Sequence, residues 1–178
     1  MALVQISRGA EVKHNYVDGV SRVPILEGAY HDATVERISI QPGADLTPEI
    51  FSRQEHNQVF LITAGKGYIV TPRRVFNITE VSVFVPDFDK EQFTFHCAAD
   101  AKETMEIVHF VTELSDYDKT CLKESHLTLP RFRGVSQAWH YKEDFTGADI
   151  QQMMLIEHRN LGRLSMGANF GTGPNYIG

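Results

Sequence analysis

Apolar and polar residues alternate along much of the first 114 residues of the chain. The alternating runs occupy residues 35–40, 59–70, 81–86, 92–97 and 105–111, and the turn Gly65-Lys66-Gly67 divides the second run. Successive side chains of a strand point to opposite faces, so such runs give one buried face and one solvated face. Short strands separated by Gly, Pro, Asn and Asp are typical of an antiparallel all-β sandwich or barrel.

The pattern changes after residue 112, where periodicity weakens and polar residues dominate. We interpret residues 115–150 as a connecting segment with a helical turn near residues 116–123. Strand-like order returns at residues 151–158 and 162–167. The expected organisation is an N-terminal arm with the first strands at 1–34, a barrel at 35–114, the connecting segment at 115–150, and additional strands at 151–178.

A short internal similarity links the two ends of the chain. Arg37-Ile-Ser-Ile followed by Gly43-Ala-Asp-Leu resembles Arg163-Leu-Ser-Met followed by Gly167-Ala-Asn-Phe. Chance and duplication both explain two matches of this length. If the segment is a duplication, the chain holds one barrel and the first strands of a second. Those strands then complete the first barrel, pair with another subunit, or belong to a longer two-barrel protein.

Composition narrows the functional classes. The chain has 178 residues, 42% of them hydrophobic, and a formal net charge of −6. No Lys and Arg cluster points to nucleic acid, and no apolar stretch approaches the ~20 residues of a membrane helix. The two cysteines, Cys97 and Cys121, lack metal-type spacing. Without a recognisable signal peptide, we expect a cytoplasmic protein with neither nucleic acid nor membrane as a partner.

Two segments between residues 41 and 95 resemble the cupin superfamily. QPGADL followed by VFLITAGKGYIV is similar to the first cupin motif, and EVSVFVPDFDKEQF is similar to the second. The resemblance implies an antiparallel double-stranded β-helix, which is the jelly-roll barrel of RmlC-like cupins, here with extra C-terminal strands. With the internal similarity, it also raises the possibility that the chain is the N-terminal part of a bicupin.

The resemblance also implies where metal ligands would lie, and this chain departs from the pattern there. The family's glutamate falls on Gln58, and the histidine of the second motif falls on Glu91. The two histidines of the first motif fall on residues 51–54 by one count and on Glu49 and Phe51 by another, and neither count gives His-x-His. We therefore expect a degenerate metal site. The fallback is a divalent transition metal on His56, Glu49 and Glu91, although we favour the interpretation of His56 as a solvated loop residue.

This alignment with the two motifs also predicts which side chains line the interior of the barrel, which we call the cup. Its polar and aromatic members are Glu49, Phe51, Arg53, Gln58, Phe60, Glu91, Phe93 and Phe95. Residues 91, 93 and 95 share one face, so His96 faces outward. A carboxylate among aromatic rings is a candidate general acid or base, which makes Glu91 the tentative catalytic residue. The alternative is a structural ion pair of Glu91 with Arg53 or Lys90.

These observations favour a cupin-type barrel that binds a small polar or sugar-acid-like molecule. It would act structurally or as a regulator in a homodimer or beside a second barrel. The alternative is a metal-dependent cupin enzyme with rearranged ligands: an isomerase, epimerase, lyase or dioxygenase. Whether the chain is an enzyme at all stays open at this point.

Overall fold

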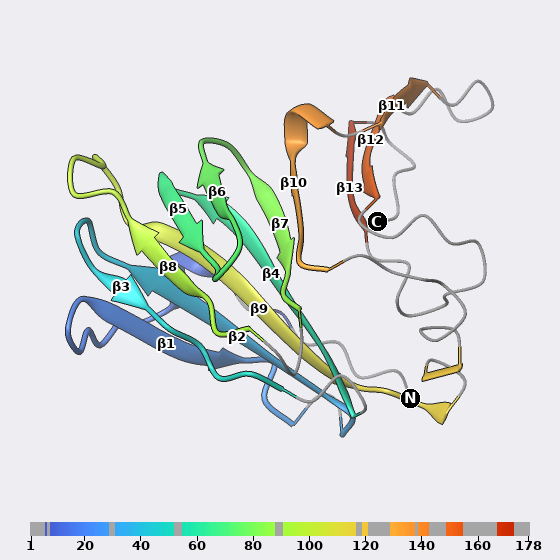
Figure 1. The fold of residues 1–178 in the computed structure, drawn as a ribbon, viewed down its shortest axis with the longest axis horizontal. Helices are drawn as coiled ribbons and strands as arrows, with labels where there is room; N and C mark the ends of the chain where they lie inside the picture. Colours follow the sequence, from blue (N-terminus) through green and yellow to red (C-terminus); the bar gives the residue numbers. More distant parts are fainter. Residues whose placement is uncertain are drawn as a thin grey trace.

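The computed structural model describes residues 6, 8–28, 31–51, 55–87, 91–116, 119–120 and 129–137, and the backbone alone of 139–142, 149–154 and 167–172. Its strands, shown in Figure 1, are β1 (Val20–Ile25), β2 (Ala33–Ile40), β3 (Asp45–Leu46), β4 (His56–Ala64), β5 (Gly67–Val70), β6 (Val75–Ile78), β7 (Ser82–Val85), β8 (Thr94–Cys97), β9 (Met105–Glu113), β10 (Arg131–Gly134), β11 (Trp139–Lys142), β12 (Asp149–Met154) and β13 (Gly167–Thr172). Two short 3-10 turns, η1 (Gly9–Glu11) and η2 (Val135–Gln137), complete the named elements.

The barrel consists of two antiparallel sheets. The larger has the order β1-β2-β9-β4-β7-β10, and the smaller has the order β3-β8-β5-β6. Strands that are distant in sequence are neighbours in space: β9 lies between β2 and β4 and pairs with both. The prediction of an all-β antiparallel fold is confirmed.

The core lies between the two sheets and follows the alternation along each strand. On β9, Met105, Ile107, His109 and Val111 are buried, while the residues between them are partly exposed. Phe60, Phe84, Phe93 and Phe95 form the aromatic centre, with ring centroids 5.0–6.3 Å apart. The predicted facing of β8 is confirmed, because Phe95 is buried and His96 points outward to Asp45.

The Gly-Lys-Gly turn between β4 and β5 is required by close backbone packing. Gly65 has a φ of +88°, which an L side chain rarely adopts. A Cβ on Gly67 would lie 1.9 Å from the carbonyl oxygen of His96 on β8. Glycine therefore lets β5 approach β8 and join the smaller sheet.

The segment after β9 contains more strand than its sequence pattern predicted. Asp116, Lys119 and Thr120 are helical, in agreement with the expected turn. β10 then pairs with β7 at the edge of the larger sheet, where Phe132 stacks on Phe76. β10 has the sequence Arg-Phe-Arg-Gly, which shows no apolar alternation, and it forms because β7 offers a free edge.

β11, β12 and β13 form a separate three-stranded antiparallel sheet. Residues 155–166 lie outside the described residues, so the similarity of residues 163–166 to β2 remains a prediction. Within the described part of the chain, no helix has the length and apolar character needed to cross a membrane.

Candidate functional site

Four polar side chains lie on the inner face of the larger sheet, one on each of four adjacent strands. They are Arg22 on β1, Glu36 on β2, His109 on β9 and Gln58 on β4. Glu36 and His109 are direct cross-strand partners. Glu36, Gln58 and His109 alternate in phase with buried apolar residues, so their strands direct them inward. Arg22 is partly exposed and lies opposite the core residue Ile38 on β2. We call these four residues the relay.

The relay is joined by short hydrogen bonds. Arg22 donates from Nε (3.0 Å) and Nη2 (2.6 Å) to the two carboxylate oxygens of Glu36. Nδ1 of His109 lies 2.6 Å from Oε1 of Glu36. On the other side of the imidazole, Nε2 of His109 lies 3.0 Å from Nε2 of Gln58, and the ring stacks on Phe60 with centroids 4.2 Å apart.

The backbone of Glu49 determines the proton arrangement of the relay. Nε2 of Gln58 donates to the carbonyl oxygen of Glu49 at 3.1 Å. In the opposite orientation of the amide, Oε1 of Gln58 would face this carbonyl oxygen, and two acceptors cannot hydrogen-bond to each other. The same NH₂ group therefore donates its second proton to Nε2 of His109. An imidazole nitrogen that accepts carries no proton, so in this hydrogen-bond arrangement the ring proton of His109 is on Nδ1 and is donated to Glu36.

Glu36 is held as an anion. Burial alone would raise the pKa of Glu36, but hydrogen bonds from His109 and Arg22 and the charges of Arg22 and His109 outweigh it and lower the pKa from 4.5 to about 2. The hydrogen bond with Glu36 in turn raises the pKa of Arg22 above its ordinary value. The carboxylate therefore stays charged across the physiological range.

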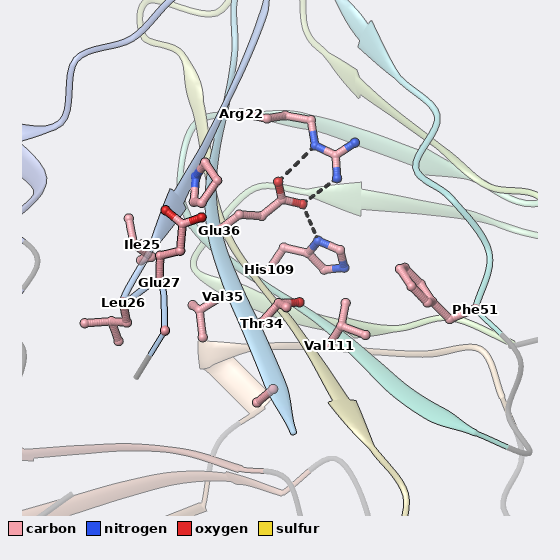
Figure 2. Close-up of a pocket in the computed structure, with 13 residues that line it drawn as sticks. Arg22, Ile25, Leu26, Glu27, Thr34, Val35, Glu36, Phe51, His109 and Val111 are labelled. Carbon is pink, nitrogen blue, oxygen red and sulfur yellow. Dashed lines mark hydrogen bonds and ion pairs between the residues drawn. The ribbon is translucent and has the colours of Figure 1, made fainter. Parts of the chain in front are cut away.

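A cavity of about 330 Å³ opens beside the relay. Its lining comprises Arg22, residues 24–28, residues 33–36, Phe51, His109 and Val111, and Figure 2 shows the labelled members of this set. Leu26 has a φ of +56°, which turns the chain at the end of β1 so that the following residues can form one wall. The walls are mostly apolar, and the Glu36 ion pair and the edge of His109 supply polar groups.

The structure brings together only some of the residues predicted to line the cup. Phe51 lines the cavity. Glu49 and Gln58 are adjacent to it, since both connect to His109 through the hydrogen bonds above. Arg53 lies outside the described residues. Phe60, Phe93 and Phe95 are 0–2% exposed and form the aromatic core, and they are not among the residues that line this cavity.

Glu91 lies apart from the relay. Its side chain is 8% exposed and forms an ion pair with Arg73, which is 68% exposed. The sequence alternative of a structural ion pair thus describes this contact with Arg73, whereas Arg53 and Lys90, the partners it named, lie outside the described residues. Oε2 of Glu91 is buried without a hydrogen-bond partner among the described residues.

The residues present do not fit the metal that the sequence resemblance implies. Among the described residues, no group of three or more His, Cys, Asp or Glu is placed to hold an ion. Both ring nitrogens of His109 are engaged by the relay, and Glu91 is engaged by Arg73. His56 contacts the ring of Phe51, with centroids 5.4 Å apart, and its buried Nδ1 has no partner in the described part of the chain. One such nitrogen is not a metal site.

Sequence reasoning predicted only Gln58 among the four relay residues. It assigned no site role to Arg22, Glu36 or His109. Their positions along the strands could have indicated them. Glu36 shares one strand face with Ile38 and Ile40, and His109 shares one with Met105 and Ile107. A charged residue in phase with buried ones requires a partner inside the barrel.

Comparison with known proteins shows which solved structures have a similar fold. A scan against protein-family models finds no match, and neither does a search of curated proteins. Among solved structures, a protein assigned as glyoxylate-induced from Pseudomonas aeruginosa has a TM-score of 0.60 at 6% identity, over 83% of this chain and 54% of that one. YlbA from E. coli has a TM-score of 0.54 at 10% identity, over 82% of this chain and 61% of that one. KdgF from Halomonas sp. has a TM-score of 0.51 at 14% identity, over 64% of this chain and 97% of that one.

Both sequence segments that resemble cupin motifs lie in this pair of sheets, the first from β3 to β5 and the second from β7 towards β8. The barrel has the cupin fold. At these identities the similar structures establish the architecture and carry no information on ligand or reaction. The cupin fold expected from the sequence is confirmed.

Proposed function

We propose that this cupin barrel binds a small polar molecule in the 330 Å³ cavity beside the relay. The volume falls within the range of ligand pockets, about 300–1,000 Å³. Apolar walls with a few oriented polar groups are typical of such sites. The single observation that carries the proposal is this cavity, which borders a charged pair held rigidly on the inner face of the barrel.

The polar groups suit a hydroxylated or acidic molecule. Arg22 uses Nε and Nη2 for Glu36, which leaves Nη1 outside that pair, and its side chain is 42% exposed. A carboxylate or hydroxyl of a ligand could accept from Nη1. The aliphatic wall and Phe51 suit the apolar face of a sugar-like ring.

Binding can be tested with D-glucuronate and its neutral counterpart D-glucose. Thr34 lines the cavity but is exposed, so Thr34→Phe fills the opening without disturbing the core. Asn77→Phe on the exposed face of β6 is the matched control. We expect saturable NMR shift changes at residues 22–28, 33–36 and 109–111 in the wild type and in Asn77→Phe, and at least tenfold weaker binding in Thr34→Phe. Absence of saturable binding of both sugars, or equal binding by Thr34→Phe, would contradict the proposal.

We further propose that the chain works in a homodimer or beside a second barrel. Two of the similar structures are longer chains that align with this one over only 54% and 61% of their own length. β6 ends the smaller sheet as an edge strand, with Val75 60% exposed. Light scattering of the purified chain should give twice the monomer mass if it self-associates. A monomer that also fails to associate with a second barrel would exclude this arrangement.

Elemental analysis tests the metal-dependent enzyme as the alternative. The donor set described above does not fit a metal. Stoichiometric nickel, iron, manganese or zinc in the purified protein would show that ligands outside the described residues complete a site, and would favour the enzyme.

A further inference from the structure

The relay ends on the segment that carries Phe51. Residues 47–51 run between β3 and β4 without regular structure, and we call them the rim. The rim is held at one end by a 2.8 Å hydrogen bond between the hydroxyls of Thr47 and Thr94. Its centre is held by the hydrogen bond from Gln58 to the carbonyl oxygen of Glu49. Phe51 then lines the cavity.

We call the hydrogen bond from Gln58 to the carbonyl oxygen of Glu49 the tether. The tether requires that His109 is neutral. The amide NH₂ group has two protons, one for Glu49 and one for Nε2 of His109, and both acceptors must be available at once. Oε1 of Gln58 has no partner among the described residues although the residue is 1% exposed. The amide therefore leaves a buried acceptor unsatisfied in order to hold this orientation, which costs free energy.

Protonation of His109 reverses the preference of the amide. An imidazolium donates from both ring nitrogens, so Nε2 of His109 then needs an acceptor where Gln58 now presents a donor. Rotation of the amide by 180° places Oε1 opposite Nε2 and satisfies both atoms. The same rotation brings Oε1 against the carbonyl oxygen of Glu49, and the tether to the rim is lost.

The groups that face His109 come from β1, β2 and β4. Glu36 on β2 faces Nδ1 as an anion, and Arg22 on β1 faces Glu36 from its other side. On β4, Gln58 and the ring of Phe60 face the imidazole and are uncharged. The carboxylate of Glu49 acts on Arg22. Glu36 remains ionised throughout and can balance the charge of an imidazolium.

We propose that His109 and Gln58 form a pH-sensitive latch that holds the rim, and with it Phe51 in the cavity wall, at neutral pH and releases it in acid. This inference rests on the proposed binding function, because it describes how access to that cavity is regulated. A molecule bound under the rim is retained while His109 is neutral. Acidification frees residues 49–51 and increases the dissociation rate of the molecule.

The latch can be tested in the full chain without a ligand. NMR of the wild type between pH 8 and 5 should show the Gln58 side-chain amide and the backbone amides of residues 49–51 shifting with the same midpoint as the His109 ring. Hydrogen exchange of the rim, corrected for the intrinsic pH dependence, should rise about fivefold across that midpoint. This factor corresponds to the loss of one hydrogen bond of about 1 kcal/mol.

Two variants separate the latch from general acid effects. His109→Gln has no imidazole to protonate, so its rim should show no such transition. His96→Gln removes an imidazole on the outer face of β8 and should behave as the wild type. Gln58→Met lacks the tether and should show the faster exchange at every pH, which provides a second readout if His109→Gln does not fold.

Rim amides that stay unchanged while His109 titrates, or a transition that persists in His109→Gln, would overturn the latch. Because the readout needs no small molecule, its failure is distinguishable from failure of the proposed function. Sugar binding that is lost in Thr34→Phe would still support the cavity even if the rim were insensitive to pH.

Discussion

Replacement of Glu36 by Gln tests how much the relay contributes to the free energy of unfolding. The pKa of Glu36 is about 2 in the folded protein, against an ordinary value of 4.5. The difference corresponds to about 3 kcal/mol of stability at neutral pH. Since the side chain is 18% exposed, solvent screening reduces the expected value to about 2–3 kcal/mol.

The pH dependence has a definite sign. Because its pKa is lower when folded, Glu36 binds fewer protons in the folded than in the unfolded state between pH 2 and 4.5. Its contribution is therefore fully present above about pH 4.5 and is lost as the pH falls towards 2. Glu36→Gln should be about 2–3 kcal/mol less stable than the wild type at pH 7, and this difference should shrink progressively in acid.

Urea unfolding followed by circular dichroism at pH 7, 5, 4 and 3 measures this difference. Glu106 on the outer face also has a lowered pKa, because hydrogen bonds from Ser39 and Thr104 and its pairing with Arg37 outweigh the effect of burial. Its acid sensitivity is common to both proteins and cancels in the comparison. Glu103→Gln, at an exposed turn, is the control and should follow the wild type at every pH. A stability difference for Glu36→Gln that is absent at pH 7, or constant from pH 7 to 3, would refute the reasoning.

Three further substitutions address the core, the turn and the candidate catalytic carboxylate. Phe60→Ala should cost about 3–5 kcal/mol in urea unfolding, because a fully buried ring at the centre of the aromatic cluster is removed. Gly67→Ala should cost about 1–3 kcal/mol or more, because its Cβ would collide with the carbonyl oxygen of His96. Glu91→Gln should change stability by less than about 1 kcal/mol, because its partner Arg73 is largely exposed. Glucuronate binding by Glu91→Gln should be unchanged, since Glu91 is not among the residues that line the cavity.

Matched variants make these predictions specific. Val75→Ala removes an exposed apolar side chain and should alter stability by less than about 0.5 kcal/mol. Lys66→Ala, within the same turn as Gly67, should be equally mild. A loss of stability as large as that of Phe60→Ala or Gly67→Ala in these controls would indicate a general fragility of the barrel. Loss of glucuronate binding in Glu91→Gln would show that Glu91 takes part in binding.

Local patterns predicted β2, β4, β5, β7, β8 and β9 and the facing of β8. Alternation placed Phe93 and Phe95 inward and His96 outward, since the facing of a strand residue depends on its own position alone. The Gly-Lys-Gly turn marked the connection between β4 and β5, and the motif resemblance indicated the barrel. β10 was missed because its sequence, Arg-Phe-Arg-Gly, shows no alternation of several apolar residues, and the free edge of β7 makes it a strand.

The composition of the candidate site depended on strand pairing, which local pattern does not encode. Glu36 and His109 are 73 residues apart in sequence, and Gln58 and His109 are 51 apart, yet barrel closure makes them neighbours. The sequence by itself indicated that Gln58 would face inward, whereas the continuous apolar run around His109 leaves the facing of that residue open. Only the tertiary structure decided that they would meet, because the order of strands in a closed barrel is set by packing of the whole core and not by any one segment.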